Sequence, residues 1–162
     1  MCWLFGLETA ANAAGLMFNK WDVYSHVMGT DYSWPGSPAS FEQLDEAATY
    51  AAQLMGKTLK RWNGNGQVDD VASFMDIARQ QQYFLEAGVH MRDLVSIAGN
   101  PSYNDFWHFV VVRQLSGQDV LVVDSFRYQD GGSDQYSKAD FIQAMKDNWT
   151  GNQQYAYAWQ WV

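Results

Sequence analysis

The sequence predicts an α+β fold, in which helices come first and an antiparallel sheet follows. Apolar residues recur every three or four positions through much of residues 2–62, which is the spacing of one buried helix face. Later apolar runs are rich in valine and aromatic residues, and residues 155–162 alternate large aromatic with smaller side chains, as strands do. We find no internal repeat and no linker, so residues 1–162 are expected to form a single domain.

The first half of the chain carries the clearest helix signals. A wide apolar stripe with many small side chains predicts a helix over about residues 2–18. Glycine and proline residues over 29–39 predict a surface loop. Ser40, with Gln43 three residues later, matches a capping box, which predicts a second helix from Ser40 to about residue 62.

Two further helices and a set of strands are expected beyond this point. Asp69 or Asp70 would cap a short third helix, and Ser137 would cap a last one that runs to about residue 149. Residues 87–89 are expected as a turn, and Ser116-Gly117-Gln118 as the tight turn of a hairpin. The expected strands cover residues 83–85, 93–98, 107–115, 119–126 and 155–162.

Charge and composition exclude several classes of partner. The net charge is −8, and the ten Lys and Arg residues are scattered, whereas phosphate binding needs clustered cations. Nucleic acid and anionic membranes are therefore not expected as partners. No apolar run is long enough to span a bilayer. With no basic region ahead of the first apolar stretch, we expect no signal peptide and synthesis in the cytoplasm; secretion or delivery into a host cell would need a signal-peptide-independent route.

Cys2 is the only cysteine of the chain. A single cysteine excludes internal disulfides and every multi-cysteine zinc pattern. His26 and His90 have no histidine or carboxylate at ligand spacing, so we expect neither a metal nor a cofactor.

A catalytic triad is predicted from three positions. Cys2 would open the first helix, where unpaired N–H groups and the helix dipole favour the nucleophilic thiolate. His108 stands at the head of one hairpin strand and Asp124 at the end of the other, so we expect them to be cross-strand neighbours. A carboxylate there can fix the tautomer of the imidazole. The alternatives are a buried structural cysteine and an incidental His–Asp pair.

These motifs resemble those of papain-like cysteine peptidases. Cys2-Trp3-Leu4-Phe5 is similar to the Cys-Trp-x-Phe that opens their central helix, and His108 with the aliphatic residues after it is similar to their catalytic histidine. Residues 122–126, Val-Val-Asp-Ser-Phe, resemble the strand that ends in Asn-Ser-Trp. The compact members include bacteriocin-processing peptidase domains, Josephin-type deubiquitinases and bacterial cysteine-protease effectors.

The resemblance implies a peptidase or related thiol hydrolase that acts on a protein or peptide, for example as a bacterial or phage effector. Cys2 would be the nucleophile, His108 the general acid/base and Asp124 the residue that orients it, in a groove between the helices and the sheet. Trp3, Trp34 and Trp107 are candidates for lining that cleft, with packing in the core as the alternative role.

Two other functions stay open. The family pattern has a glutamine before the cysteine that supplies half of the oxyanion hole, and here only Met1 precedes Cys2. This favours an inactive or weakly active binding module on the same fold, unless the chain is truncated or another donor substitutes. The opening Met1-Cys2-Trp3-Leu4-Phe5-Gly6 also resembles glutamine amidotransferases whose N-terminal cysteine is the nucleophile, although that cysteine begins a strand.

Overall fold

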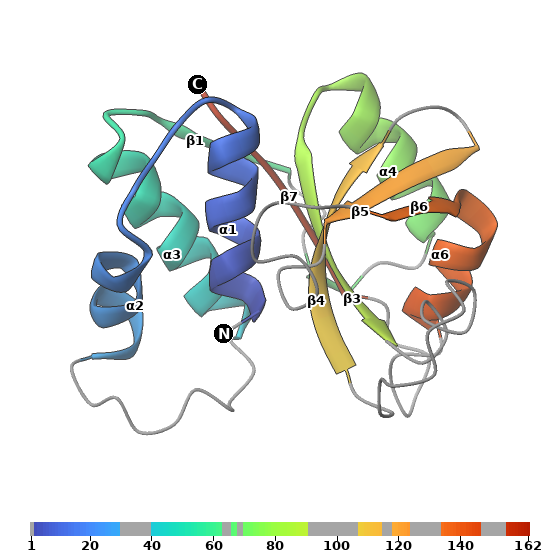
Figure 1. Ribbon diagram of the computed structural model, residues 1–162, viewed down its shortest axis with the longest axis horizontal. Helices are drawn as coiled ribbons and strands as arrows, with labels where there is room; N and C mark the ends of the chain where they lie inside the picture. Colours follow the sequence, from blue (N-terminus) through green and yellow to red (C-terminus); the bar gives the residue numbers. More distant parts are fainter. Residues whose placement is uncertain are drawn as a thin grey trace.

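The computed structural model confirms an α+β architecture. Helices α1, α2 and α3 cover one face of an antiparallel sheet, and helices α4 and α6 cover the other (Figure 1). The strand order is β1-β7-β3-β4-β5-β6, and β2 also pairs with β7. The structure describes residues 2–29, 40–62, 66–67, 70–90, 107–114, 118–123, 134–146 and 155–162.

Helix α1 (Cys2–Ala13) begins as expected and ends earlier than the predicted residue 18. Gly15 has a φ of +71°, and the N–H of Leu16 donates to the carbonyl of Ala11, which closes a Schellman motif. The chain then enters α2 (Lys20–Met28), a helix that the sequence pattern did not predict because few of its residues are buried.

Helix α3 (Phe41–Leu54) confirms the capping box and corrects the predicted helix end. The side chain of Ser40 accepts from the N–H of Gln43, and the Gln43 side chain accepts from the N–H of Ser40. The helix ends in a second Schellman motif, with Gly56 at φ +64°. Residues 55–62 are therefore not helical, and strand β1 (Leu59–Arg61) pairs with β7 instead.

The sheet contains one strand where a strand and a turn were predicted. Strand β3 (Phe84–His90) runs straight through residues 87–89, because β4 pairs with it on one side and β7 on the other. The predicted turn at those residues is therefore wrong. Strands β2 (Gly66–Gln67) and β6 (Asp134–Ser137) were not predicted, and the strand expected over 93–98 lies outside the described residues.

The remaining predicted helices and strands are present, whereas the loop expected over 29–39 and the turn expected at Ser116-Gly117-Gln118 lie almost entirely outside the described residues. Strands β4 (Trp107–Gln114) and β5 (Asp119–Val123) pair antiparallel, and β7 (Tyr155–Trp161) forms the closing strand. Asp70 caps α4 (Val71–Gln80) by accepting from the N–H of Ser73. Helix α6 (Lys138–Lys146) follows Ser137, whose hydroxyl accepts from the N–H of Asp140.

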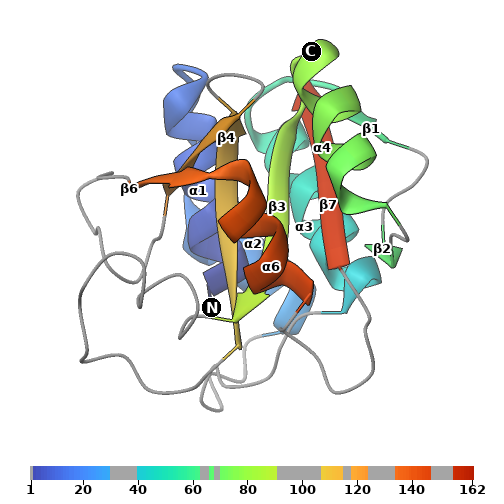
Figure 2. The same ribbon diagram turned by 90° about the vertical axis from the view of Figure 1, so that its right-hand side faces the viewer.

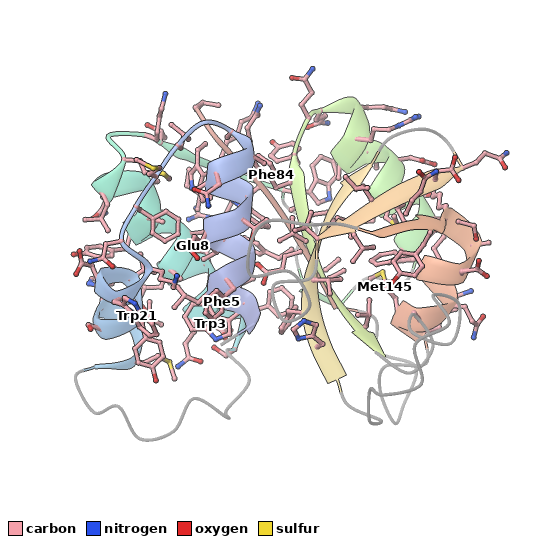
Figure 3. All side chains as sticks on the ribbon, in the orientation of Figure 1. Trp3, Phe5, Glu8, Trp21, Phe84 and Met145 are labelled. Carbon is pink, nitrogen blue, oxygen red and sulfur yellow. The ribbon has the colours of Figure 1, made fainter. Side chains whose placement is uncertain are left out.

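Alternate residues of the sheet pack into two separate cores. We call the side covered by α1, α2 and α3 the α1 face, and the side covered by α4 and α6 the α4 face. Trp3 belongs to the core on the α1 face and Met145 to the core on the α4 face (Figure 3). Phe109 and Val111 of β4 join the first core, and other side chains of the same strand join the second.

Among the described residues, no helix is long and apolar enough to cross a membrane.

Candidate functional site at the start of helix α1

Cys2 is the first residue of α1, as the sequence predicts. The next two residues fix this end of the helix: Trp3 is 2% exposed and Leu4 is fully buried, both in the core of the α1 face. The helix start therefore has a defined place on the sheet, and its unpaired N–H groups surround the position of Cys2. The side chain of Cys2 itself lies outside what the structure describes.

His108 is the second residue of β4 and is 3% exposed. Its Cα is paired with that of Val89 near the end of β3. Figures 1 and 2 both show that α1 and β4 begin at the same end of the molecule. The structure thus brings Cys2 and His108 to the same end of the molecule, although 105 residues lie between them in the sequence.

The side chain of His108 lies on the α4 face of the sheet. Val89, its cross-strand partner, and Val110, two residues further along β4, both belong to the core on that face. Residues directly opposite each other on paired strands point to the same face, and side chains alternate along a strand. Helix α1 covers the other face, where Phe109 and Val111 point. Cys2 and His108 therefore share an end of the sheet but not a face of it.

Of the other predicted site residues, one lies in the core and the rest have side chains that the structure does not describe. Trp3 packs in the core, which favours its structural role over the lining of a cleft. Trp107 is the first residue of β4, and its side chain is not among those described. Trp34 and Asp124 lie outside the described residues, so the predicted contact between Asp124 and His108 stays a prediction.

Sequence reasoning missed Glu86, a buried carboxyl group beneath α1. Glu86 lies in β3, fully buried, opposite Val111 on one side and Tyr157 on the other. A Cβ atom added to Gly6 would stand 2.8 Å from Oε1 of Glu86. Because Gly6 follows Cys2 by four positions, both project from the same side of α1, and the carboxyl lies about one helical turn from the position of Cys2. The sequence did contain a signal for this buried carboxyl group, because Glu86 is an acidic residue inside an apolar run.

Among the described residues, no three His, Cys, Asp or Glu side chains gather closely enough to hold a metal ion. His26 lies in the last turn of α2, where its ring stacks on Tyr50 at 3.9 Å between centroids and its Nε2 is 3.5 Å from Oε1 of Glu46. This histidine therefore joins α2 to α3.

No family model matches the chain, and no curated protein matches it either.

Proposed function

We propose that the chain is a cysteine hydrolase of papain-like architecture, a peptidase with Cys2 as its nucleophile. The observation that carries the proposal is the anchored start of α1: the buried Trp3 and Leu4 hold the first turn of the helix against the sheet. Helix N-terminal N–H groups and the helix dipole lower the pKa of a thiol placed there, and the thiolate is the attacking form.

His108 supports the proposal by its position at the same end of the molecule. In the proposed reaction, the thiolate attacks the carbonyl carbon of an amide, and the protonated imidazole gives its proton to the amine as the C–N bond breaks. Water then attacks the acyl carbon while the imidazole accepts a proton from that water, and the C–S bond breaks, which releases the carboxylic acid and restores the thiolate. For this role the imidazole of His108 must reach the Cys2 thiol around the end of the sheet. The last pair of β3 and β4 at that end is His90 and Trp107.

The reactivity of Cys2 tests this proposal, because it is the chain's only cysteine and every alkylation reports on it. We expect iodoacetamide to alkylate Cys2 at about pH 6 at least roughly tenfold faster than free cysteine, whose pKa of about 8.5 keeps it protonated there. His108→Gln should slow this reaction by about tenfold, since it removes the cation that favours the thiolate. The matched control is His26→Gln, which should leave the rate unchanged.

Alkylation at the rate of free cysteine would refute the activated thiol. Equal rates for His108→Gln and the parent chain, with unchanged far-ultraviolet circular dichroism, would exclude His108 as the partner of Cys2.

A binding module without hydrolase activity is the second candidate, and the face occupied by His108 favours it. The core on the α4 face contains the cross-strand partner of His108, so a structural role for this histidine accounts for its burial. The same alkylation experiment separates the two candidates. The amidotransferase alternative loses support, because its nucleophile begins a strand and Cys2 begins a helix.

A further inference from the structure

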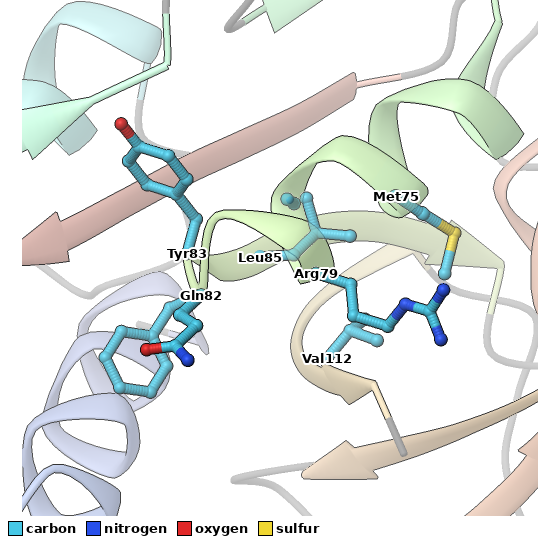
Figure 4. Close-up of a pocket in the computed structure, with 8 residues that line it drawn as sticks. Met75, Arg79, Gln82, Tyr83, Leu85 and Val112 are labelled. Atoms are coloured by element: carbon cyan, nitrogen blue, oxygen red, sulfur yellow. The ribbon is translucent and has the colours of Figure 1, made fainter. Parts of the chain in front are cut away.

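A pocket of about 300 Å³ opens where α4 ends and β3 begins, and Val112 near the end of β4 completes its wall (Figure 4). It lies at the opposite end of β3 and β4 from His108, so the proposed hydrolase site does not use it. Its volume is at the lower limit for pockets that hold small molecules. Buried apolar side chains form its floor: Met75, Ala78, Leu85 and Val112.

One cationic side chain lines the rim of the pocket, and a second lies near a lining residue. Arg79, exposed in the last turn of α4, lines the pocket, and its guanidinium has no hydrogen bond or ion pair with any other residue of the described ranges. The ammonium group of Lys60 lies 6.0 Å from the ring centre of Tyr83, another lining residue. No carboxylate is found among the described residues that line the pocket. In a chain of net charge −8, this local positive charge favours an anionic ligand.

Gln82 supplies a second polar group at the rim, in an unusual backbone conformation. It has a φ of +59°, and it ends α4 in a Schellman motif: its own N–H donates to Arg79 and the N–H of Tyr83 donates to Ala78. The same motif ends α1 and α3, where glycine occupies the corresponding position. Glycine is favoured there because it has no Cβ. Of these three helix ends, only the one at the pocket carries a side chain at this position, and that side chain lines the cavity (Figure 4).

We propose that this pocket binds a small organic acid with an apolar body. The body would lie on the floor formed by Met75, Leu85 and Val112, and the carboxylate would accept hydrogen bonds from the guanidinium of Arg79. A guanidinium presents two parallel N–H donors that match the two oxygens of a carboxylate. The amide of Gln82 lies on the other side of the pocket in Figure 4, so the carboxylate would bond to Arg79 and not to Gln82.

Titration of the full chain with octanoate and with 1-octanol tests the proposal, since the two probes share an apolar chain and differ in charge. We expect octanoate to bind at least roughly tenfold more tightly than 1-octanol, which is the effect of one charge-assisted contact. In methyl-detected NMR, the signals of Met75, Leu85 and Val112 should shift on binding. Arg79→Gln should reduce octanoate affinity about tenfold and leave 1-octanol binding within about twofold.

Two further variants keep the result interpretable. Lys57→Gln removes an exposed cation near the end of α3, outside the pocket, and should leave octanoate affinity within about twofold. Gln82→Gly removes the other polar side chain that lines the pocket, at a position where glycine is favoured, and it should leave octanoate affinity within about twofold. Equal affinity for the two probes, an unchanged affinity in Arg79→Gln, or methyl shifts confined to residues outside the pocket would each overturn the proposal.

Discussion

Gly6 is a residue at which α1 lies close against the sheet. A Cβ atom at this position would meet Oε1 of Glu86 at 2.8 Å and Cγ2 of Val111 at 3.1 Å. Glu86 is fully buried, and Val111 has a branched side chain, so neither can move aside toward solvent. Glycine is therefore required here by close packing rather than by backbone conformation, and a small residue lets the helix that begins at Cys2 lie against β3 and β4.

We expect Gly6→Ala to destabilise the fold by about 1–2 kcal/mol. Overpacking a core costs about 1–3 kcal/mol, and the better helix propensity of alanine recovers up to about 1 kcal/mol of it. Urea unfolding of the two proteins measures the difference. In a Glu86→Ala background only the tight contact with Cγ2 of Val111 remains, so the same substitution should there cost clearly less. An equal cost in both backgrounds would contradict the contact with Glu86.

At the scale of single elements, helix beginnings follow from nearby residues. The reciprocal bonds between Ser40 and Gln43 join positions three apart, so the start of α3 needs no tertiary contact to be specified. The end of α3 is different. Its apolar spacing continues past Leu54, and the chain leaves the helix because Gly56 adopts a positive φ and Leu59 pairs with Trp161.

Ser40→Ala should lower the free energy of unfolding by about 1 kcal/mol, because the N–H of Gln43 loses its acceptor. Ser40→Asn is the matched control, since asparagine caps helices about as well as serine, and it should retain most of the parent stability. Thermal or urea unfolding of the three proteins makes the comparison. Equal destabilisation by alanine and asparagine would mean that the cap contributes nothing through its side-chain acceptor.

At the scale of the whole molecule, a polar cluster joins three elements. The hydroxyl of Tyr157 in β7 donates to Oδ1 of Asp45 in α3 at 2.8 Å, and Nε of Arg61 in β1 donates to the same oxygen at 2.6 Å. Burial is the main cause that raises the pKa of Tyr157 well above its ordinary value, and the adjacent Asp45 carboxylate adds to it. The folded chain therefore holds this proton at a pH at which the unfolded chain loses it.

This shift makes stability depend on alkaline pH. Below the ordinary tyrosine pKa of 10.0 the contribution of Tyr157 is fully present, and it is lost as the pH rises above that value. The loss from this one group approaches about 1.4 kcal/mol per pH unit. Urea unfolding between pH 9 and pH 11.5 should show a steeper decline for the parent chain than for Tyr157→Phe, which has no proton to lose. Parallel declines would contradict the buried, protonated hydroxyl.

Elements that depend only on neighbouring residues could be predicted from the sequence. Helix starts at Ser40 and Asp70 were predictable because a cap and the N–H that it satisfies lie within three positions. The hairpin of β4 and β5 and the closing strand β7 were predictable because strand composition and period-two alternation are local patterns.

The pairing of strands and the face on which each side chain lies depend on contacts between elements that are distant in the chain. Strand β3 continues through Gly88 because β4 pairs with it there, and β4 follows only after a long interval of sequence. Side chains alternate along a strand, so His108 and Phe109 must lie on opposite faces of the sheet. Which of the two faces α1 covers depends on how the helix packs, so the sequence could not predict the face on which His108 lies. The burial of Glu86 and the pocket beside Arg79 likewise arise from contacts between elements distant in the chain, which no local pattern encodes.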